Sequence, residues 1–81
     1  MDPDFVFERM MEYIVKDDFK TARASALSDM NKIGEGSLSS MLIMTAQNKI
    51  DLIKVIAGFT IMSKNVQQYY TNPEKAINDY S

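Results

Sequence analysis

Apolar residues recur at helical spacing through the first third of the chain. These positions are Val6, Phe7, Met10, Ile14, Phe19, Ala22, Ala26, Met30 and Ile33. Asp2 and Pro3 form a helix start, because Asp caps helices and the fixed φ of proline suits the first helical position. The pattern therefore predicts a helix over residues 3–33. Asp17 and Asp18 interrupt its apolar face, so we expect either a kink or two helices that meet there.

A turn signal follows this segment. The stretch GEGS contains two glycines, and Gly34 suits the left-handed conformation that ends many helices. Ser37 or Ser39 is expected to cap the next helix. That helix is predicted over residues 38–70, and a short third helix over residues 73–80. Because a short turn makes neighbouring helices antiparallel, the sequence predicts an all-α fold, a long antiparallel helical hairpin with a short C-terminal helix.

The second predicted helix is apolar around more of its circumference than one neighbour would cover. A helix with one partner carries an apolar stripe roughly 100° wide, and this segment carries two stripes. We expect that the 81 residues cannot cover both and that oligomerisation completes the fold. The candidate interface residues are Leu42, Ala46, Ile50, Leu52, Ile53, Ile56, Ala57, Phe59, Ile61 and Val66. Because Ile53 lies on the second stripe, Ile53→Asp is expected to disrupt association more than helicity.

Composition removes other ways of stabilising a small domain. The chain contains no Cys and no His, so disulfides are excluded and a zinc site is not expected. The net charge is −2 and the basic residues are not clustered, which argues against a nucleic-acid partner. The uncharged run between Lys54 and Lys64 is too short for a membrane-spanning helix, which needs about 20 residues. Oligomerisation is the stabilising device that this composition leaves open.

The sequence offers no complete catalytic or metal site. The loop DMNKIGEGSLSS places Asp29, Asn31 and Gly34 at three positions of a calcium loop, but the fifth and twelfth positions lack ligands. The adjacent carboxylates Asp17 and Asp18 would point about 100° apart on a helix, so they would not flank one bond. No His or Cys supplies a base or a nucleophile. We therefore expect no metal, no cofactor and no enzymatic activity.

Three features leave alternatives open. Methionines at helical spacing are typical of core packing, but a Met-rich surface can also adapt to a partner. They are Met10, Met11, Met30, Met41, Met44 and Met62. Asp51 and Lys54 lie three residues apart and could form an ion pair within the helix or fix the register between subunits. Gly58 costs about 1 kcal/mol relative to Ala within a helix, and is tolerated if another backbone approaches closely.

The stretch SLSSMLIMTAQNKIDLIKVIAGFTIMSKNVQQYY, residues 37–70, resembles the C-terminal helix of small type III secretion inner-rod proteins. It is also similar to that helix in needle-type subunits and in the related flagellar rod and adaptor proteins. Comparable places hold Gln47, Ile50, Leu52, Val55, Thr60, Lys64 and Val66. The resemblance implies subunits that pack side by side into a hollow rod or needle, with no catalytic residue.

These observations predict a non-enzymatic structural or assembly protein, whose apolar second helix packs against other subunits as in a secretion rod. The alternative is a small helical adaptor, chaperone or regulator that binds one partner protein. A third possibility is a self-sufficient helical monomer with a ligand pocket. The N-terminus MDPDF lacks the order of a cleaved secretory signal, so we expect synthesis in the cytoplasm, with export that needs no cleaved signal left open.

Overall fold

The chain folds as a set of short α-helices. The structure is a computed structural model and describes residues 2–34 and 36–81. In order, the helices of this part are α1 (Pro3–Val15), α2 (Phe19–Lys32), α3 (Gly36–Thr45), α4 (Lys49–Ala57), α5 (Lys64–Thr71) and α6 (Pro73–Tyr80). The predicted all-α class is confirmed. The long helix predicted over residues 38–70 is wrong because that range is divided, whereas residues 3–33 hold two helices, one of the two alternatives that the sequence left open.

The first predicted helix is two helices that meet at Asp17 and Asp18. α1 begins as predicted, because Oδ1 of Asp2 accepts a hydrogen bond from the backbone N–H of Asp4 at 3.0 Å. α1 is followed by Asp17, whose φ of 63° is left-handed. Oδ1 of Asp18 then accepts from the backbone N–H of Thr21 at 3.2 Å and caps α2. The break in the apolar pattern is therefore a tight turn between helices.

Gly34 follows α2 in the left-handed conformation that the sequence predicts. Its φ is 87°, which glycine adopts without a steric cost. Glu35, inside the predicted turn, lies outside the described residues. The predicted cap at Ser37 or Ser39 is wrong, because both serines lie within α3. The hydroxyl of Ser39 instead donates to the backbone carbonyl of Gly36 at 2.9 Å.

The segment predicted as one second helix is first broken at Asn48. This residue has an extended backbone, and its Oδ1 accepts from the backbone N–H of Asp51 at 2.9 Å, which caps α4. The carboxylate of Asp51 accepts in turn from the backbone N–H of Gln47 at 3.4 Å. This reciprocal arrangement satisfies backbone donors that would otherwise lack partners at the start of the helix.

The second break lies between α4 and α5 and depends on a residue far away in the sequence. Ser63 caps α5, since its hydroxyl oxygen accepts from the backbone N–H of Val66 at 3.4 Å. The same hydroxyl donates to Oδ2 of Asp4 at 2.7 Å, and the Ser63 N–H donates to Oδ1 of Asp4 at 3.2 Å. Because Asp4 lies in the first turn of α1, these bonds join the starts of α1 and α5.

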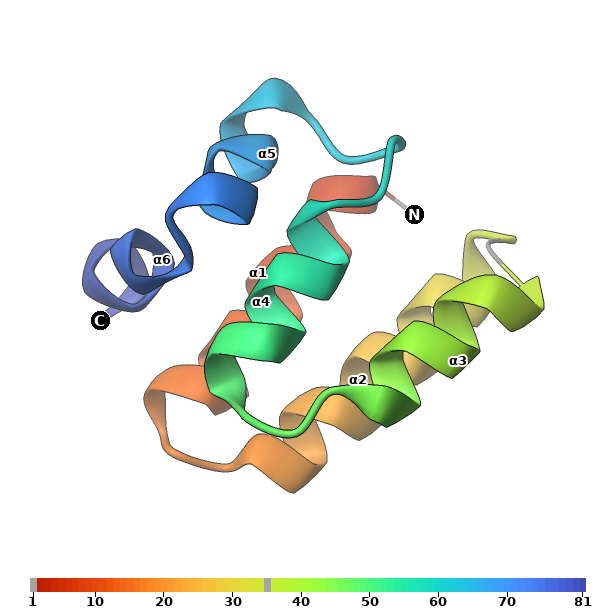
Figure 1. The fold of residues 1–81 in the computed structure, drawn as a ribbon, viewed down its shortest axis with the longest axis horizontal. Helices are drawn as coiled ribbons and strands as arrows, with labels where there is room; N and C mark the ends of the chain where they lie inside the picture. Colours follow the sequence, from red (N-terminus) through yellow and green to blue (C-terminus); the bar gives the residue numbers. More distant parts are fainter. Residues whose placement is uncertain (1, 35) are drawn as a thin grey trace.

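The helices are arranged so that α4 contacts all five others. In Figure 1, α1 and α2 run in opposite directions behind, and α4 and α3 lie in front of them. α5 and α6 pack against α4, and α6 also packs on α1. The chain measures 29 × 26 × 20 Å along its principal axes. This arrangement covers the apolar side of α4 with neighbours from within one chain, while Lys54 on its outer side stays exposed.

Burial confirms the central position of α4. Leu52, Ile53, Ile56 and Ala57 are each 0% exposed. The expectation that one chain cannot cover this segment is wrong for α4, whereas Leu38, Met41 and Leu42 of the same segment stay exposed. The breaks at residues 46–48 and 58–63 let the same chain pack around α4. Ile53 therefore lies in the core of the monomer, where a charge would disrupt folding itself.

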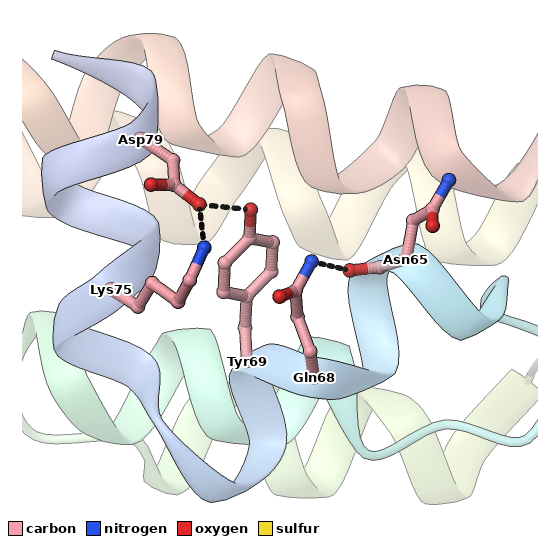
Figure 2. Close-up of polar contacts among 5 residues, drawn as sticks. All are labelled: Asn65, Gln68, Tyr69, Lys75 and Asp79. Atoms are coloured by element: carbon pink, nitrogen blue, oxygen red, sulfur yellow. Dashed lines mark hydrogen bonds and ion pairs between the residues drawn. The ribbon is translucent and has the colours of Figure 1, made fainter.

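An aromatic and polar cluster joins α5 and α6 to α1. The rings of Phe7 and Tyr69 stack at 5.3 Å, and the Tyr80 ring meets both edge-on. The Tyr69 hydroxyl donates to Oδ2 of Asp79 at 2.8 Å, and Nζ of Lys75 donates to the same oxygen at 2.6 Å (Figure 2). Tyr69 thus has an apolar neighbour for its ring and a charged acceptor for its hydroxyl.

These contacts shift the pKa of both partners. Burial, together with the hydrogen bond to Asp79, raises the pKa of Tyr69 to about 12. The hydrogen bonds from Lys75 and Tyr69 hold the pKa of the Asp79 carboxyl below its usual value. Because the folded-state pKa of Tyr69 exceeds its unfolded value of 10.0, the resulting stabilisation is complete below pH 10. It is lost as the pH rises toward 12.

The central position of α4 predicts the effect of truncating its side chains. Ile53→Ala should lower the free energy of unfolding by about 2–5 kcal/mol, because it leaves a cavity in the core. Ile50→Ala on the same helix is the matched control, since Ile50 is only half-buried. Urea unfolding of both variants measures the difference. Equal losses would contradict the assignment of Ile53 to the monomer core.

The Tyr69 cluster predicts how stability falls in alkali. Between pH 10 and 12 the wild-type free energy of unfolding should fall most steeply, that of Asp79→Asn less, and that of Tyr69→Phe least. Tyr69→Phe removes the shifted group, whereas Asp79→Asn removes only the charged acceptor. Urea unfolding at several pH values measures the three slopes. Identical slopes would show that the Tyr69–Asp79 contact does not shift the titration.

Candidate functional site

α3 carries apolar residues on two opposite faces. On its inner face Ser39 and Ile43 are buried. On its outer face the exposed apolar residues are Leu38 (61%), Met41 (62%), Leu42 (40%) and Met44 (55%). The helix contains no charged residue. A surface helix normally turns its apolar side toward the core, whereas α3 turns four large apolar side chains to the outside, so its outer face is the feature of this surface that a globular fold does not explain.

The outer residues follow the spacing of a packing face. Leu38, Met41, Leu42 and Thr45 stand at i, i+3, i+4 and i+7, which places them along one side of the helix. We call this set with Met44 the α3 outer face. Single exposed apolar residues are common on soluble proteins, but a row on one short helix is typical of an interaction surface.

A groove between α3 and α4 continues from this face. Its larger part has a volume of about 300 Å³ and is lined by Leu42, Lys54, Val55, Gly58, Phe59 and Tyr70. An adjoining hollow of about 250 Å³ is lined by Leu42, Thr45, Ala46, Asp51, Lys54 and Val55. Leu42 belongs to both parts and to the α3 outer face. The groove and the face therefore form one connected surface across α3, α4 and α5.

Gly58 lies at the base of the groove, under an aromatic ring. A Cβ at this position would be 3.0 Å from a ring carbon of Tyr70 and 3.0 Å from the carbonyl oxygen of Lys54. A close approach that would explain Gly58 is thus present at the end of α4, and it comes from the Tyr70 side chain and the helix's own Lys54 carbonyl rather than from the backbone of another segment. Nζ of Lys54 lies 5.8 Å from the centre of the Tyr70 ring, within the range of a cation–π interaction.

Asp51 and Lys54 place opposite charges along the same groove. They lie one turn apart on α4, yet neither forms an ion pair with any residue of 2–34 or 36–81. The intrahelical ion pair that the sequence allowed is therefore not formed between them. Lys54 is exposed and Asp51 is half-buried, so both charges are accessible from the groove.

The structure separates the ten predicted interface residues into two groups. Those in the chain's own core are Ala46, Leu52, Ile53, Ile56, Ala57 and Val66. Of the others, Leu42 is exposed, and Ile50, Phe59 and Ile61 are half-buried. Leu42 and Phe59 line the groove. In this fold the surface available to a partner is centred on α3, which is the N-terminal part of the helix predicted over residues 38–70.

The apolar helix predicted over residues 38–70 included Leu38 and Tyr70, which are both exposed, and the methionine spacing contained a signal for Met41 and Met44. The structure divides the methionines between the core and the surface. Those in the core are Met10, Met11, Met30 and Met62. Met41 and Met44 are exposed on the α3 outer face, where a flexible thioether side chain can adapt its shape to a partner.

Asp29 is the first residue of the calcium-loop pattern, and its carboxylate lies next to two basic side chains of the same chain. Its side chain is 1% exposed, with Oδ2 3.5 Å from Nε of Arg9 and Oδ1 3.9 Å from Nζ of Lys32. A buried carboxylate of this kind joins α1 to α2 and needs both charges to remain stable. The described residues contain no group of three or more acidic side chains that could hold a metal ion.

The remaining acidic and hydroxyl candidates have structural partners. Asp17 pairs with Nζ of Lys49 at 2.9 Å, and Asp18 caps α2. The Ser40 hydroxyl donates to the carbonyl of Gly36 at 3.1 Å. Over the described part of the chain, no helix has the length and apolar character needed to cross a membrane.

Comparison with known proteins adds no assignment to this geometry. No family model, no curated protein and no solved structure matches the chain. The α3 outer face and its groove are accordingly interpreted from their own physical chemistry.

Proposed function

We propose that this chain is a non-enzymatic protein-interaction module. Its contact surface is the α3 outer face together with the groove between α3 and α4. The observation that carries the proposal is that α3 buries only Ser39 and Ile43 against the chain itself, while its outer side exposes Leu38, Met41, Leu42 and Met44. This feature supports both function classes that the sequence predicts, self-association and an adaptor that binds one partner.

The energies support a surface that combines the face with the groove. Burying a fully exposed Leu or Met side chain contributes about 1.5–3 kcal/mol, and the residues of the α3 outer face are about half exposed. Their burial is then worth several kcal/mol, similar to the lower range of the 4–15 kcal/mol that association costs. Contacts in the groove, with Phe59 and Tyr70, supply the surplus that binding requires.

The secretion-rod resemblance does not enter this proposal. It implies a continuous helix over residues 37–70, whereas that range contains α3, α4 and most of α5. The acidic and hydroxyl side chains considered as catalytic or metal-binding candidates have structural contacts instead: Asp17 and Asp29 lie against cations, Asp18 caps α2 and Ser40 donates to a backbone carbonyl, which supports a non-enzymatic role. The proposal therefore keeps protein association and leaves out the rod architecture.

The first expected outcome concerns stability. Leu38→Ser combined with Met41→Ser should leave the monomer's free energy of unfolding within about 0.5 kcal/mol of wild type, because both side chains are exposed. Met30→Ser, in the core, should lower it by about 2–5 kcal/mol. Urea unfolding in dilute solution compares them. A loss in the double variant as large as in Met30→Ser would mean that the α3 outer face is needed for folding rather than for docking.

A direct test of the function uses displayed helical peptides of random sequence, selected on the immobilised wild-type chain. Selected peptides should perturb the amide NMR signals of α3 and of residues 54–59. Their affinity should fall at least about tenfold on the Leu38→Ser/Met41→Ser variant and stay unchanged on Glu12→Ala, an exposed position of α1. Peptides that bind elsewhere, or no selected peptide, would contradict the proposal.

A further inference from the structure

The charges beside the α3 outer face have an order that restricts the partner. Asp51 and Lys54 both line the groove and are separated by one helical turn. Neither has an ion-pair partner within residues 2–34 and 36–81. α3 itself carries no charge. A partner that covers this surface therefore meets a neutral apolar helix bordered by one acid and one base.

We propose that the partner is a second copy of this chain, docked through the same surface about a two-fold axis. In such a contact, if residue i meets residue j of the partner, residue j meets residue i of the partner. Lys54 then faces Asp51 of the second copy, and Asp51 faces its Lys54. The chain thus already carries the charge pattern that complements its own groove. This inference rests on the proposed function and names its partner.

The apolar part of the surface is also compatible with itself. The two α3 helices meet without any charge repulsion between them, because neither carries a charged residue. The groove beside each α3 is lined by Val55, Phe59 and Tyr70 and opens next to Leu42. A Met or Leu side chain from the partner's α3 can enter it, and the flexible Met41 adapts most easily to its shape.

The size of the surface sets the expected strength of the dimer. A standard interface buries about 800 Å² per partner, and the whole chain exposes 4722 Å². The contact must therefore cover about one sixth of the molecule. α3 has 10 residues and is about 15 Å long, so it cannot supply this area alone. With the groove and Tyr70 included, the surface spans three helices, which suits a dimer with a dissociation constant on the order of micromolar.

A different protein matches both charges of this surface only if its own sequence places a base opposite Asp51 and an acid opposite Lys54. A second copy of this chain already carries both charges, so the two-fold arrangement needs no further sequence feature. The second copy is therefore the occupant that the charges favour, and a different protein is an outcome that the experiment can reveal.

Sedimentation equilibrium of the purified chain over a wide concentration range tests the inference. The wild type should change from monomer to dimer as concentration rises, and Leu38→Ser/Met41→Ser should remain a monomer. Lys54→Asp and Asp51→Lys should each weaken the dimer by about tenfold or more, because each places like charges opposite one another twice.

Mixing the two charge variants gives the sharpest outcome. Lys54→Asp carries two acids and Asp51→Lys carries two bases, so an equimolar mixture should form a heterodimer that neither variant forms alone. Circular dichroism verifies that each variant is folded. Asp51 also contributes to the start of α4, so Asp51→Asn serves as a milder second variant. It should weaken the dimer by severalfold and, when mixed with Lys54→Asp, should restore the dimer only in part, because that heterodimer keeps one Asp51–Lys54 pair where the wild type has two.

Three results would overturn the second-copy inference. These are a wild type that stays monomeric up to about millimolar concentration, a dimer that Leu38→Ser/Met41→Ser does not weaken, and a mixture that does not form the heterodimer. In the first case, peptides that still bind α3 would preserve the proposed function and indicate a different protein as the partner. If peptides also fail to bind α3, both proposals are wrong.

Discussion

The structure depends on enclosing α4 within a single short chain. α4 (Lys49–Ala57) has an apolar inner side whose residues are 0% exposed, and it contacts all five other helices. A chain of 81 residues has a thin core, so it can surround a helix only if the surrounding elements are short. The two breaks on either side of α4 meet this condition. They turn what reads as one long apolar helix into a central helix and its neighbours.

The local signals for helix ends were readable where one or two residues determine them. Asp2 with Pro3 starts α1, Gly34 follows α2, and α6 begins at Pro73, as the sequence predicts. Each of these depends on the conformational preference of a residue or on a contact within a few positions. Such signals do not require knowledge of the tertiary fold, which is why they could be interpreted correctly.

The breaks around α4 were harder to predict for two different reasons. Asn48 with Asp51 is a local capping signal. It lies inside a strongly apolar segment, however, and the periodicity of that segment favours a continuous helix. The break before α5 involves Ser63 and Asp4, which are 59 positions apart. A contact of that kind forms only once α1 and α5 are adjacent, so local sequence reasoning has no access to it.

The candidate site shows what an apolar pattern can and cannot specify. The pattern indicated correctly that residues 38–70 need neighbours on several sides, but not which chain provides them. α4 finds its neighbours within the monomer, whereas the rest of the chain covers only the inner side of α3. Met41 and Met44 were ambiguous for this reason, since an exposed and a buried methionine look the same in sequence. The apolar surface that the chain leaves uncovered therefore lies on α3. The charges that border it, Asp51 and Lys54, belong to α4.

Amide hydrogen exchange of α4 at different protein concentrations tests the account most directly. If one chain encloses α4, its amides exchange only through global unfolding of the monomer. Their protection should then be high at the lowest concentration at which the chain is monomeric, and it should equal the monomer's free energy of unfolding. Weak protection of α4 in the monomer that increases only as chains associate would contradict the account, because α4 would then need a second chain to be buried.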